Sequence, residues 1–314
     1  MSLKDYVRLG LNHHLLFAAE SATSQGHYDT LKTVVNDGRL EILDLWIADD
    51  EPWRSKEIEL VANCGKEIYY NCGNRAGKPG LEPASFNPEK RQYTIDVYKD
   101  EIVRAKDCGA VKVITNSGPN NLENRAGAFD MLVDFYCQMC KFAPEMLIMI
   151  EPTDYDMSKR KLIGLSKEAV EICRRVKAKG CGNIASMVDM CHIPLMHETL
   201  EQAIKDTGEF LGHIHLGNCI KKDTSHKLYG DKHVALCMEG GEYGIDDLAE
   251  LFRVGLETGY FNKHNRGSAS IEMRTLPGDE PHRCLDLYYG YVVQAWDKCV
   301  KCVKGEKVIK VRKV

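Results

Sequence analysis

Short apolar runs alternate with longer segments of helical periodicity along most of the chain. Runs of roughly four to eight apolar residues are typical of buried strands, whereas apolar residues that recur every three or four positions are typical of amphipathic helices. The predicted strands cover residues 9–17, 41–47, 67–71, 111–115, 146–151, 183–189, 211–216 and 268–273. The predicted helices cover residues 28–36, 55–64, 94–108, 125–142, 166–178, 195–207, 245–258 and 285–300.

This alternation of strands with helices indicates an α/β fold with a parallel sheet, because parallel neighbours need a crossover connection. Eight such units within 314 residues fit a single-domain (β/α)8 TIM barrel. An open doubly wound sheet is the alternative, but no GxGxxG motif follows the first strand. We therefore expect one barrel over residues 1–300 and a lysine-rich, solvated extension over residues 301–314.

Composition and charge narrow the possible partners and location. The net charge of −4 provides no overall attraction to nucleic acid. No stretch of about 20 residues is apolar throughout, as a membrane span requires. Residues 1–12 mix charged with apolar positions, unlike a signal peptide. We expect a cytoplasmic protein with neither a nucleic-acid partner nor a membrane partner.

The 13 cysteines are an odd number and are scattered along the chain, which favours reduced thiols. Two CxxC pairs, Cys137/Cys140 and Cys299/Cys302, could together supply a structural zinc site. Both pairs fall in predicted helices, where residues three apart share a face in any case. We interpret them as incidental helix cysteines.

The candidate chemistry lies at the carboxyl ends of the last four strands, where barrel enzymes place their active sites. These strands deliver Glu151, Asp189, His215 and Glu272 to one rim, and His213 faces the interior two residues before His215. Three carboxylates so placed would repel each other unless a divalent cation joined them. Oxygen-rich ligands with one imidazole suit Mn²⁺, our first choice, with Mg²⁺, Co²⁺ or Zn²⁺ as alternatives.

The rim residues resemble the metal-site motifs of the xylose-isomerase-like sugar isomerases and epimerases. The resemblance rests on Glu151 with the proline after it, Asp189-x-x-His192, His215 and Glu272, and it covers most of the barrel. It implies that Glu151, Asp189, His215 and Glu272 bind the metal. It also implies that the two glutamates act as an acid/base pair on opposite faces of the substrate, while His192 contacts the substrate and takes part in catalysis.

This resemblance implies a mechanism for a small carbohydrate or glycoside substrate. The metal would polarise a carbonyl or hydroxyl group and stabilise an enediolate intermediate, while a glutamate removes the neighbouring carbon-bound proton. Returning the proton from the opposite face would epimerise the sugar, and returning it to the adjacent carbon would isomerise it. Expelling a β-substituent would instead make the enzyme a lyase. We expect a metal-dependent sugar isomerase or epimerase.

Four further residues are candidates for substrate binding: Asn116, Trp46, His233 and Arg274. Asn116 follows the fourth strand. Trp46 could stack on a sugar or belong to the core. His233 could contact substrate or exchange protons, or it could form a local structural pair with Asp231. Arg274 could hold an anionic substrate or pair with a carboxylate of the rim.

The segment of residues 153–164 departs from the family pattern, because many epimerases have an Asn-Arg pair after the Glu-Pro step. Its length and charge favour a larger pocket and resemble the barrel subunits of C-glycoside deglycosidases. Those enzymes cleave an aryl–sugar carbon–carbon bond by metal-assisted elimination and contain a small second subunit. We keep this lyase as the alternative function, and otherwise expect a homo-oligomer.

Two other functions are less favoured. The related AP endonucleases share the barrel but use three zinc ions and need histidines at the ends of the third and fourth strands. This chain has Asn71 and Asn116 there, and an amide replaces an imidazole poorly as a zinc ligand. A non-catalytic sugar binder would not need the acid/base pair of glutamates.

Overall fold

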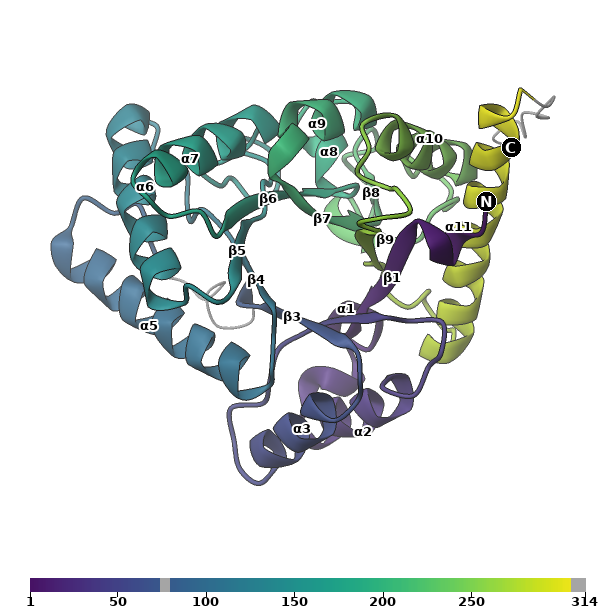
Figure 1. Ribbon diagram of the computed structural model, residues 1–314, viewed down its shortest axis with the longest axis horizontal. Coiled ribbons are helices and arrows are strands. Elements are labelled where there is room, and N and C mark those ends of the chain that lie inside the picture. Colours follow the sequence, from purple (N-terminus) through teal and green to yellow (C-terminus); the bar gives the residue numbers. More distant parts are fainter. Residues whose placement is uncertain (74–79, 306–314) are drawn as a thin grey trace.

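The computed structural model describes residues 1–73 and 80–305. Within these residues, eight parallel strands close into a barrel in the order β1-β10-β7-β6-β5-β4-β3-β2, with helices around it (Figure 1). The predicted single-domain TIM barrel is therefore confirmed. The barrel strands are β1 (Val7–Asn12), β2 (Ile42–Leu45), β3 (Glu67–Asn71), β4 (Lys112–Thr115), β5 (Leu147–Ile150), β6 (Ile184–Asp189), β7 (Leu211–Leu216) and β10 (Gly267–Ile271).

The outer layer consists of the helices that connect the strands, joined by short helices and 3₁₀ turns. The longer helices are α2 (Ser24–Val34), α3 (Trp53–Ala62), α5 (Pro88–Asp107), α6 (Arg125–Phe142), α7 (Ser166–Ala178), α9 (Leu200–Thr207), α10 (Ile245–Glu257) and α11 (Pro281–Val303). The short helices are α1 (His13–Leu16) and α8 (His192–Leu195), and the 3₁₀ turns are η1 (Leu3–Asp5), η2 (Glu20–Ala22) and η3 (Gly208–Phe210).

Several helices begin at a residue whose side chain caps the helix N-terminus. The Asn87 side chain accepts hydrogen bonds from the backbone of Glu89 and Lys90, ahead of Pro88 in the first turn of α5. The Asn124 and Thr199 side chains cap α6 and α9 in the same way. These caps satisfy backbone donors that have no partner within the helix.

Three elements differ from the sequence-based prediction. The first strand ends at Asn12, and the following residues His13–Leu16 form α1, because a short apolar run does not distinguish strand from helix. The helix predicted over residues 195–207 begins later than expected, because α9 starts at Leu200 and the separate short helix α8 ends at Leu195. After β7, the strands β8 (Asn218–Ile220) and β9 (Gly230–Val234) form an antiparallel hairpin outside the barrel, which the pattern did not predict.

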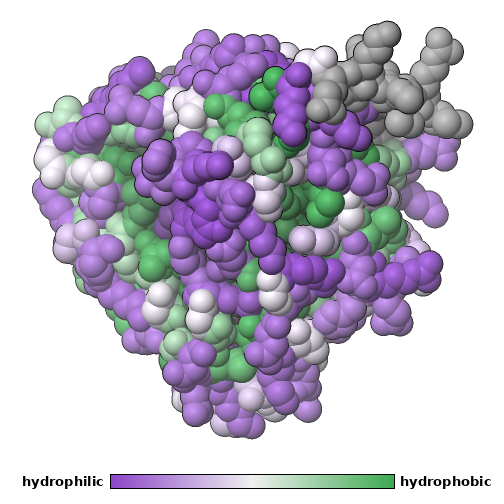
Figure 2. All heavy atoms as spheres, turned by 45° about the vertical axis from the view of Figure 1, so that its right-hand side comes forward, coloured by the Kyte–Doolittle hydropathy of each residue, from purple (hydrophilic) through white to green (hydrophobic). Residues whose placement is uncertain are grey.

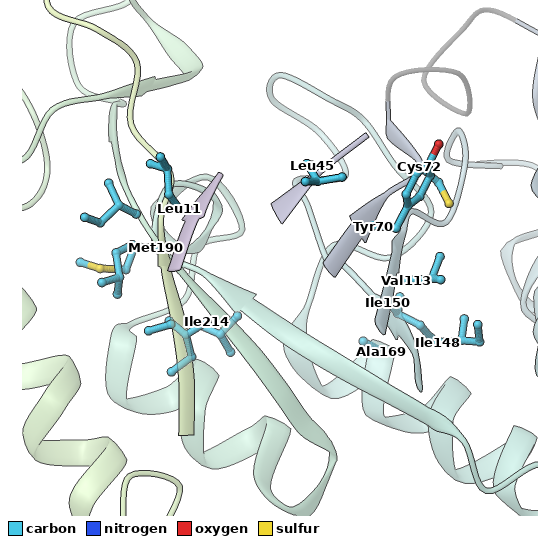
Figure 3. Packing of buried hydrophobic residues seen from close by; sticks show 14 of the residues in the cluster. Leu11, Leu45, Tyr70, Cys72, Val113, Ile148, Ile150, Ala169, Met190 and Ile214 are labelled. Carbon is cyan, nitrogen blue, oxygen red and sulfur yellow. The ribbon is translucent and has the colours of Figure 1, made fainter. Parts of the chain in front are cut away.

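Alternate residues of each strand face opposite sides of the barrel wall. Tyr70 and Val113 belong to the large apolar cluster between strands and helices, part of which is shown in Figure 3. Their neighbours Tyr69 and Ile114 belong to a separate apolar cluster inside the barrel. The period of two along each strand therefore separates an outer core from an inner one.

The inner cluster forms an apolar floor beneath a polar rim. It consists of Ile42, Tyr69, Ile114, Met149, Ala185 and Met187, with Leu147 packed against it. Two residues further along their strands, Ile42 is followed by Asp44, Met149 by Glu151 and Met187 by Asp189. The same alternation that buries the floor thus directs three carboxylates into the carboxyl end of the barrel.

The two ends of the described chain meet at α11. The Trp296 side chain of this helix donates a hydrogen bond to the Met1 carbonyl oxygen, 3.1 Å away, and the N-terminus lies beside α11 in Figure 1. Helix α11 continues to Val303, into the segment predicted as an extension, and residues 306–314 of that segment lie outside the described residues.

The surface and the cysteines add two observations. Figure 2 shows a face on which apolar residues are scattered among hydrophilic ones, and no helix of the described residues is both long and apolar enough to cross a membrane. The CxxC residues lie on helices as predicted. Cys137 and Cys140 are buried on α6, while Cys299 is buried and Cys302 exposed on α11.

We predict that Gly10→Ala destabilises the barrel. Gly10 pairs with Ser270 and Ile42 of the flanking strands, and an added Cβ would contact Ser270 Oγ and lie 2.7 Å from Ile42 Cβ. Overpacking of this kind lowers the free energy of unfolding by about 1–3 kcal/mol, which urea denaturation can measure. Gly38→Ala is the control, because nothing lies within 4 Å of its Cβ position. Equal stability of the two variants would contradict this account.

Candidate functional site

Four adjacent strands of the barrel, β5, β6, β7 and β10, supply the centre of the site. Glu151 directly follows β5, Asp189 ends β6, His215 lies in β7 and Glu272 directly follows β10. One ligand atom from each of these four residues, here called the rim cluster, lies within 4.8 Å of all the others. The structure therefore brings together the four residues that the sequence suggested as metal ligands.

The rim cluster has the geometry of a cation site. His215 Nδ1 lies 2.7 Å from Glu272 Oε2 and 3.6 Å from Glu151 Oε1. Nevertheless His215 Nδ1, Glu272 Oε2 and Asp189 Oδ2 are buried atoms that make no hydrogen bond. Buried polar atoms that lack a hydrogen bond are costly, and a shared cation would satisfy all three of them. The rim cluster thus fits a divalent metal ion.

The charges of the rim cluster are strongly perturbed by burial and by each other. Burial raises the pKa of Glu272 to about 7, although His215 and His233 oppose this shift. Burial alone would also raise the pKa of Asp189, but His192 outweighs it and holds that pKa well below its usual range. The two carboxyl groups therefore differ in proton affinity.

His192 is the first residue of α8 and lies beside the rim cluster. Its Nε2 is 2.9 Å from Asp189 Oδ2 and 3.8 Å from Glu151 Oε1, and the side chain is almost fully buried. Burial alone would lower the pKa of His192, but Asp189 and Asp231 raise it to about 10. The ring is thus placed beside two rim carboxylates.

Asp44 is a site residue that the sequence reasoning missed. It is fully buried in β2, and its Oδ2 lies 3.2 Å from His215 Nε2 and 3.3 Å from His213 Nε2. His215 therefore turns Nε2 to Asp44 and leaves Nδ1 for the rim cluster, an arrangement that fixes the orientation of a metal-binding imidazole. The sequence could have indicated this residue, because a carboxylate at Asp44 interrupts the apolar residues of β2.

Asn12, at the end of β1, was also missed. Its side-chain amide donates a hydrogen bond of 2.6 Å to Glu272 Oε1, and both residues are buried. Asn12 thus satisfies the Glu272 oxygen that faces away from His215. An asparagine at the end of a strand is too common to be recognised from sequence alone.

The hairpin β8–β9 brings Asp231 and His233 to the same place. His233 Nε2 lies 2.8 Å from Asp231 Oδ1, and its Nδ1 lies 3.5 Å from Glu272 Oε2. The two residues therefore form a local pair, and this pair also touches the rim cluster.

Within the described residues, no contact joins the other three substrate-binding candidates, Trp46, Asn116 and Arg274, to the rim cluster. Trp46 is half-buried, and one face of its ring stacks on His27 at 3.9 Å. Asn116 Oδ1 accepts a hydrogen bond from the backbone of Gly118, within the turn after β4. Arg274 is exposed and forms no ion pair with a described residue, so it does not pair with a rim carboxylate there.

The charged segment after Glu151 folds around one buried carboxylate. Asp154 accepts hydrogen bonds from the backbone N–H groups of Met157, Ser158 and Lys159, at 2.5–2.8 Å. This turn carries the Lys159 ammonium to within 2.7 Å of Asp231 Oδ2. The segment therefore contributes a positive charge at the edge of the site.

Comparison with known proteins identifies the family. Residues 40–283 match the family described as xylose isomerase-like TIM barrel. The chain belongs to this family. The resemblance inferred from the rim residues is therefore confirmed at the level of the family. No curated protein sequence is significantly similar to the chain.

Solved structures share the barrel fold at low sequence identity. A D-psicose 3-epimerase from Clostridium cellulolyticum H10 with D-tagatose superposes with a TM-score of 0.62 at 16% identity, over 93% of this chain and 98% of its own. An L-ribulose 3-epimerase gives 0.69 at 13%, over 95% and 97%. An AP endonuclease of family 2 from Brucella melitensis gives 0.57 at 15%, over 91% and 98%. Such likeness establishes the fold alone, so the reaction must be argued from the site.

We predict that Asp44→Ala destabilises this xylose isomerase-like barrel by about 1–3 kcal/mol, because it leaves the Nε2–H groups of two buried histidines without an acceptor. Urea denaturation of the metal-free protein at neutral pH measures the effect. Asp44→Asn is the matched control, since it keeps one oxygen acceptor at the same position and is expected to lose less. If the alanine variant is as stable as the wild type, the proposed contacts of Asp44 are wrong.

Proposed function

We propose that this chain is a divalent-metal-dependent carbohydrate isomerase or epimerase. The observation that carries the proposal is the convergence of Glu151, Asp189, His215 and Glu272, with three buried ligand atoms that make no hydrogen bond. These four residues would hold one ion. Their oxygen-rich set favours Mn²⁺ first, with Mg²⁺, Co²⁺ and Zn²⁺ as alternatives.

A divalent ion bound there supplies Lewis-acid polarisation of a substrate carbonyl or hydroxyl group. The chain's own residues move the protons. Glu151 is the most accessible member of the rim cluster, with 16% of its side chain exposed, whereas Glu272 is held by Asn12 and has a raised pKa. We assign these glutamates as the acid/base pair, and His192 as the residue that contacts and orients the substrate.

The substrate class follows from the family and from the structural neighbours. The neighbours include 3-epimerases whose names specify D-psicose and L-ribulose. We propose a small carbohydrate for this chain because the rim cluster sits at the carboxyl end of a barrel of the same family, where substrates of such enzymes bind.

The nuclease alternative is disfavoured by the ends of β3 and β4. Asn71 Oδ1 accepts a hydrogen bond from the backbone of Gly73, and Asn116 Oδ1 accepts one from Gly118. Both amide oxygens are therefore occupied in turns of the backbone, where a three-zinc enzyme would need histidines that bind metal. At these two positions the chain therefore does not provide the histidine ligands that the nucleases need, although it shares their fold.

The lyase alternative rests on the segment of residues 153–164. The turn built on Asp154 places charged groups beside the site, which suits a substrate larger than a simple ketose. In this case the same glutamates would remove a proton and assist departure of an aryl group. The small second subunit that such a lyase requires, like the homo-oligomer expected otherwise, stays a prediction.

We predict one divalent ion for each chain after equilibration with Mn²⁺ and removal of free metal, measured by inductively coupled plasma mass spectrometry. Asp189→Asn and Glu151→Gln are expected to lose the ion, because each removes an anionic ligand. The control is Asp156→Asn, an exposed carboxylate of the same rim that pairs with His197.

A wild-type protein that binds no manganese would contradict the proposal, as would unchanged binding in both ligand variants. Three zinc ions for each chain would instead support the nuclease.

We predict that Glu272→Gln lowers the turnover of the correct sugar by about 10²–10⁴-fold, since general acid/base groups contribute this much. The assay follows deuterium from D₂O into a panel of keto-sugars and aryl C-glycosides by NMR. An inverted carbon identifies an epimerase, an aldose an isomerase, and a free aryl group the lyase. Unchanged exchange in Glu272→Gln would show that another residue moves the proton.

A further inference from the structure

A second group of metal-binding side chains lies next to the rim cluster. Ligand atoms of Cys191, His192 and Asp231 lie within 4.8 Å of one another, and all three residues are buried. His233 adds an imidazole whose Nε2 is 2.8 Å from Asp231 Oδ1. These four residues, here called the second donor group, combine thiol, imidazole and carboxylate, a combination that suits zinc.

The second donor group already has a cation beside it. The Lys159 ammonium lies 2.7 Å from Asp231 Oδ2, and the Asp231 side chain is only 1% exposed. The Lys159 side chain is itself 47% exposed, so it reaches into the group from the rim. A buried carboxylate requires a positive partner, and this lysine provides one without any metal.

The position of Lys159 is built into the fold. Its backbone N–H and that of Ser158 donate to the buried Asp154 carboxylate, which fixes the turn. Ser158 Oγ in turn accepts a hydrogen bond of 3.3 Å from the Asp231 backbone. At Gly230 an added Cβ would lie 3.0 Å from Ser158 Oγ, so the turn and the β8–β9 hairpin are closely packed. The ammonium is thus held near Asp231 by two elements.

We propose that the Lys159 ammonium takes the place of a second metal ion at the second donor group and thereby limits the chain to one divalent ion. A second cation bound to Asp231 would lie close to the Lys159 ammonium, which is 2.7 Å from Asp231 Oδ2, and also near the ion of the rim cluster. Like charges so close together in a buried site repel each other strongly. The inference deepens the proposed function, because it assumes that the rim cluster is the first metal site. It makes Lys159 a residue that determines metal stoichiometry.

The test compares zinc content between the wild type and Lys159→Met, which keeps the length of the side chain and removes its charge. Zinc is the probe because the second donor group suits it. Each protein is equilibrated with zinc, freed of unbound metal and analysed by mass spectrometry. We expect one zinc ion in the wild type and one more in Lys159→Met. Lys159→Arg, which keeps the charge, is expected to match the wild type.

Two controls locate the additional ion. Lys161→Met removes a lysine of the same segment whose ammonium forms no ion pair with a described residue, and it should leave the zinc count unchanged. Combining Lys159→Met with Asp231→Asn should return the count to that of the wild type. Lys159→Gln repeats the test if the methionine variant does not fold, as judged by its thermal unfolding.

The difference between variant and wild type decides the inference, whereas the wild-type count alone decides the proposed function. Equal zinc content in the wild type and the neutral variants would overturn the inference, and so would a wild type that already holds a second ion at Asp231. An additional ion that persists in the double variant would also overturn it. A wild type without zinc would contradict the proposed function. If Lys159→Met then held one zinc ion, the ammonium would still be shown to exclude an ion from the second donor group, but the limit of one ion for each chain would be overturned.

Discussion

The structure of the site depends on buried negative charge at the carboxyl end of the barrel. Asp44, Glu151, Asp189 and Glu272 point into a region that is closed from below by the apolar floor. Water cannot solvate these groups fully, so each needs a positive or hydrogen-bonding partner. His213 and His215 serve Asp44, and Asn12 serves one oxygen of Glu272. The buried atoms without a hydrogen bond, Asp189 Oδ2, His215 Nδ1 and Glu272 Oε2, belong to the rim cluster, whose ligand atoms lie within 4.8 Å of one another.

On the same strands, the apolar residues that stabilise the barrel lie directly below the residues that form the site. On β5 and β6 the side chains that face inward change from Met149 and Met187 to Glu151 and Asp189 within two residues. The apolar residues pack as a closed layer, and the carboxylates stand above it on a rigid support. A site built on strand ends is held more precisely than one built on loops, which suits ligands that must share one ion.

The sequence predicted the parts of the structure that are local, and missed those that depend on closure of the barrel. Glu151 and Asp189 each come at the end of an apolar run, so the run and its terminal residue are visible together, and His215 is the next-to-last residue of its strand. The contact between Asp44 and His215 joins residues 171 positions apart across the barrel. No pattern within either strand specifies it. The β8–β9 hairpin escaped prediction because β8 has only three residues, fewer than a period of two can reveal.

The segment after Glu151 was only partly predictable from the sequence. Its length and charge were plain in the sequence, but the destination of Lys159 was not, because it is set by a turn around the buried Asp154 carboxylate. A buried aspartate that binds several backbone N–H groups converts a flexible loop into a fixed one. The strands thus determine where a metal could bind, while this turn determines which charge stands next to it.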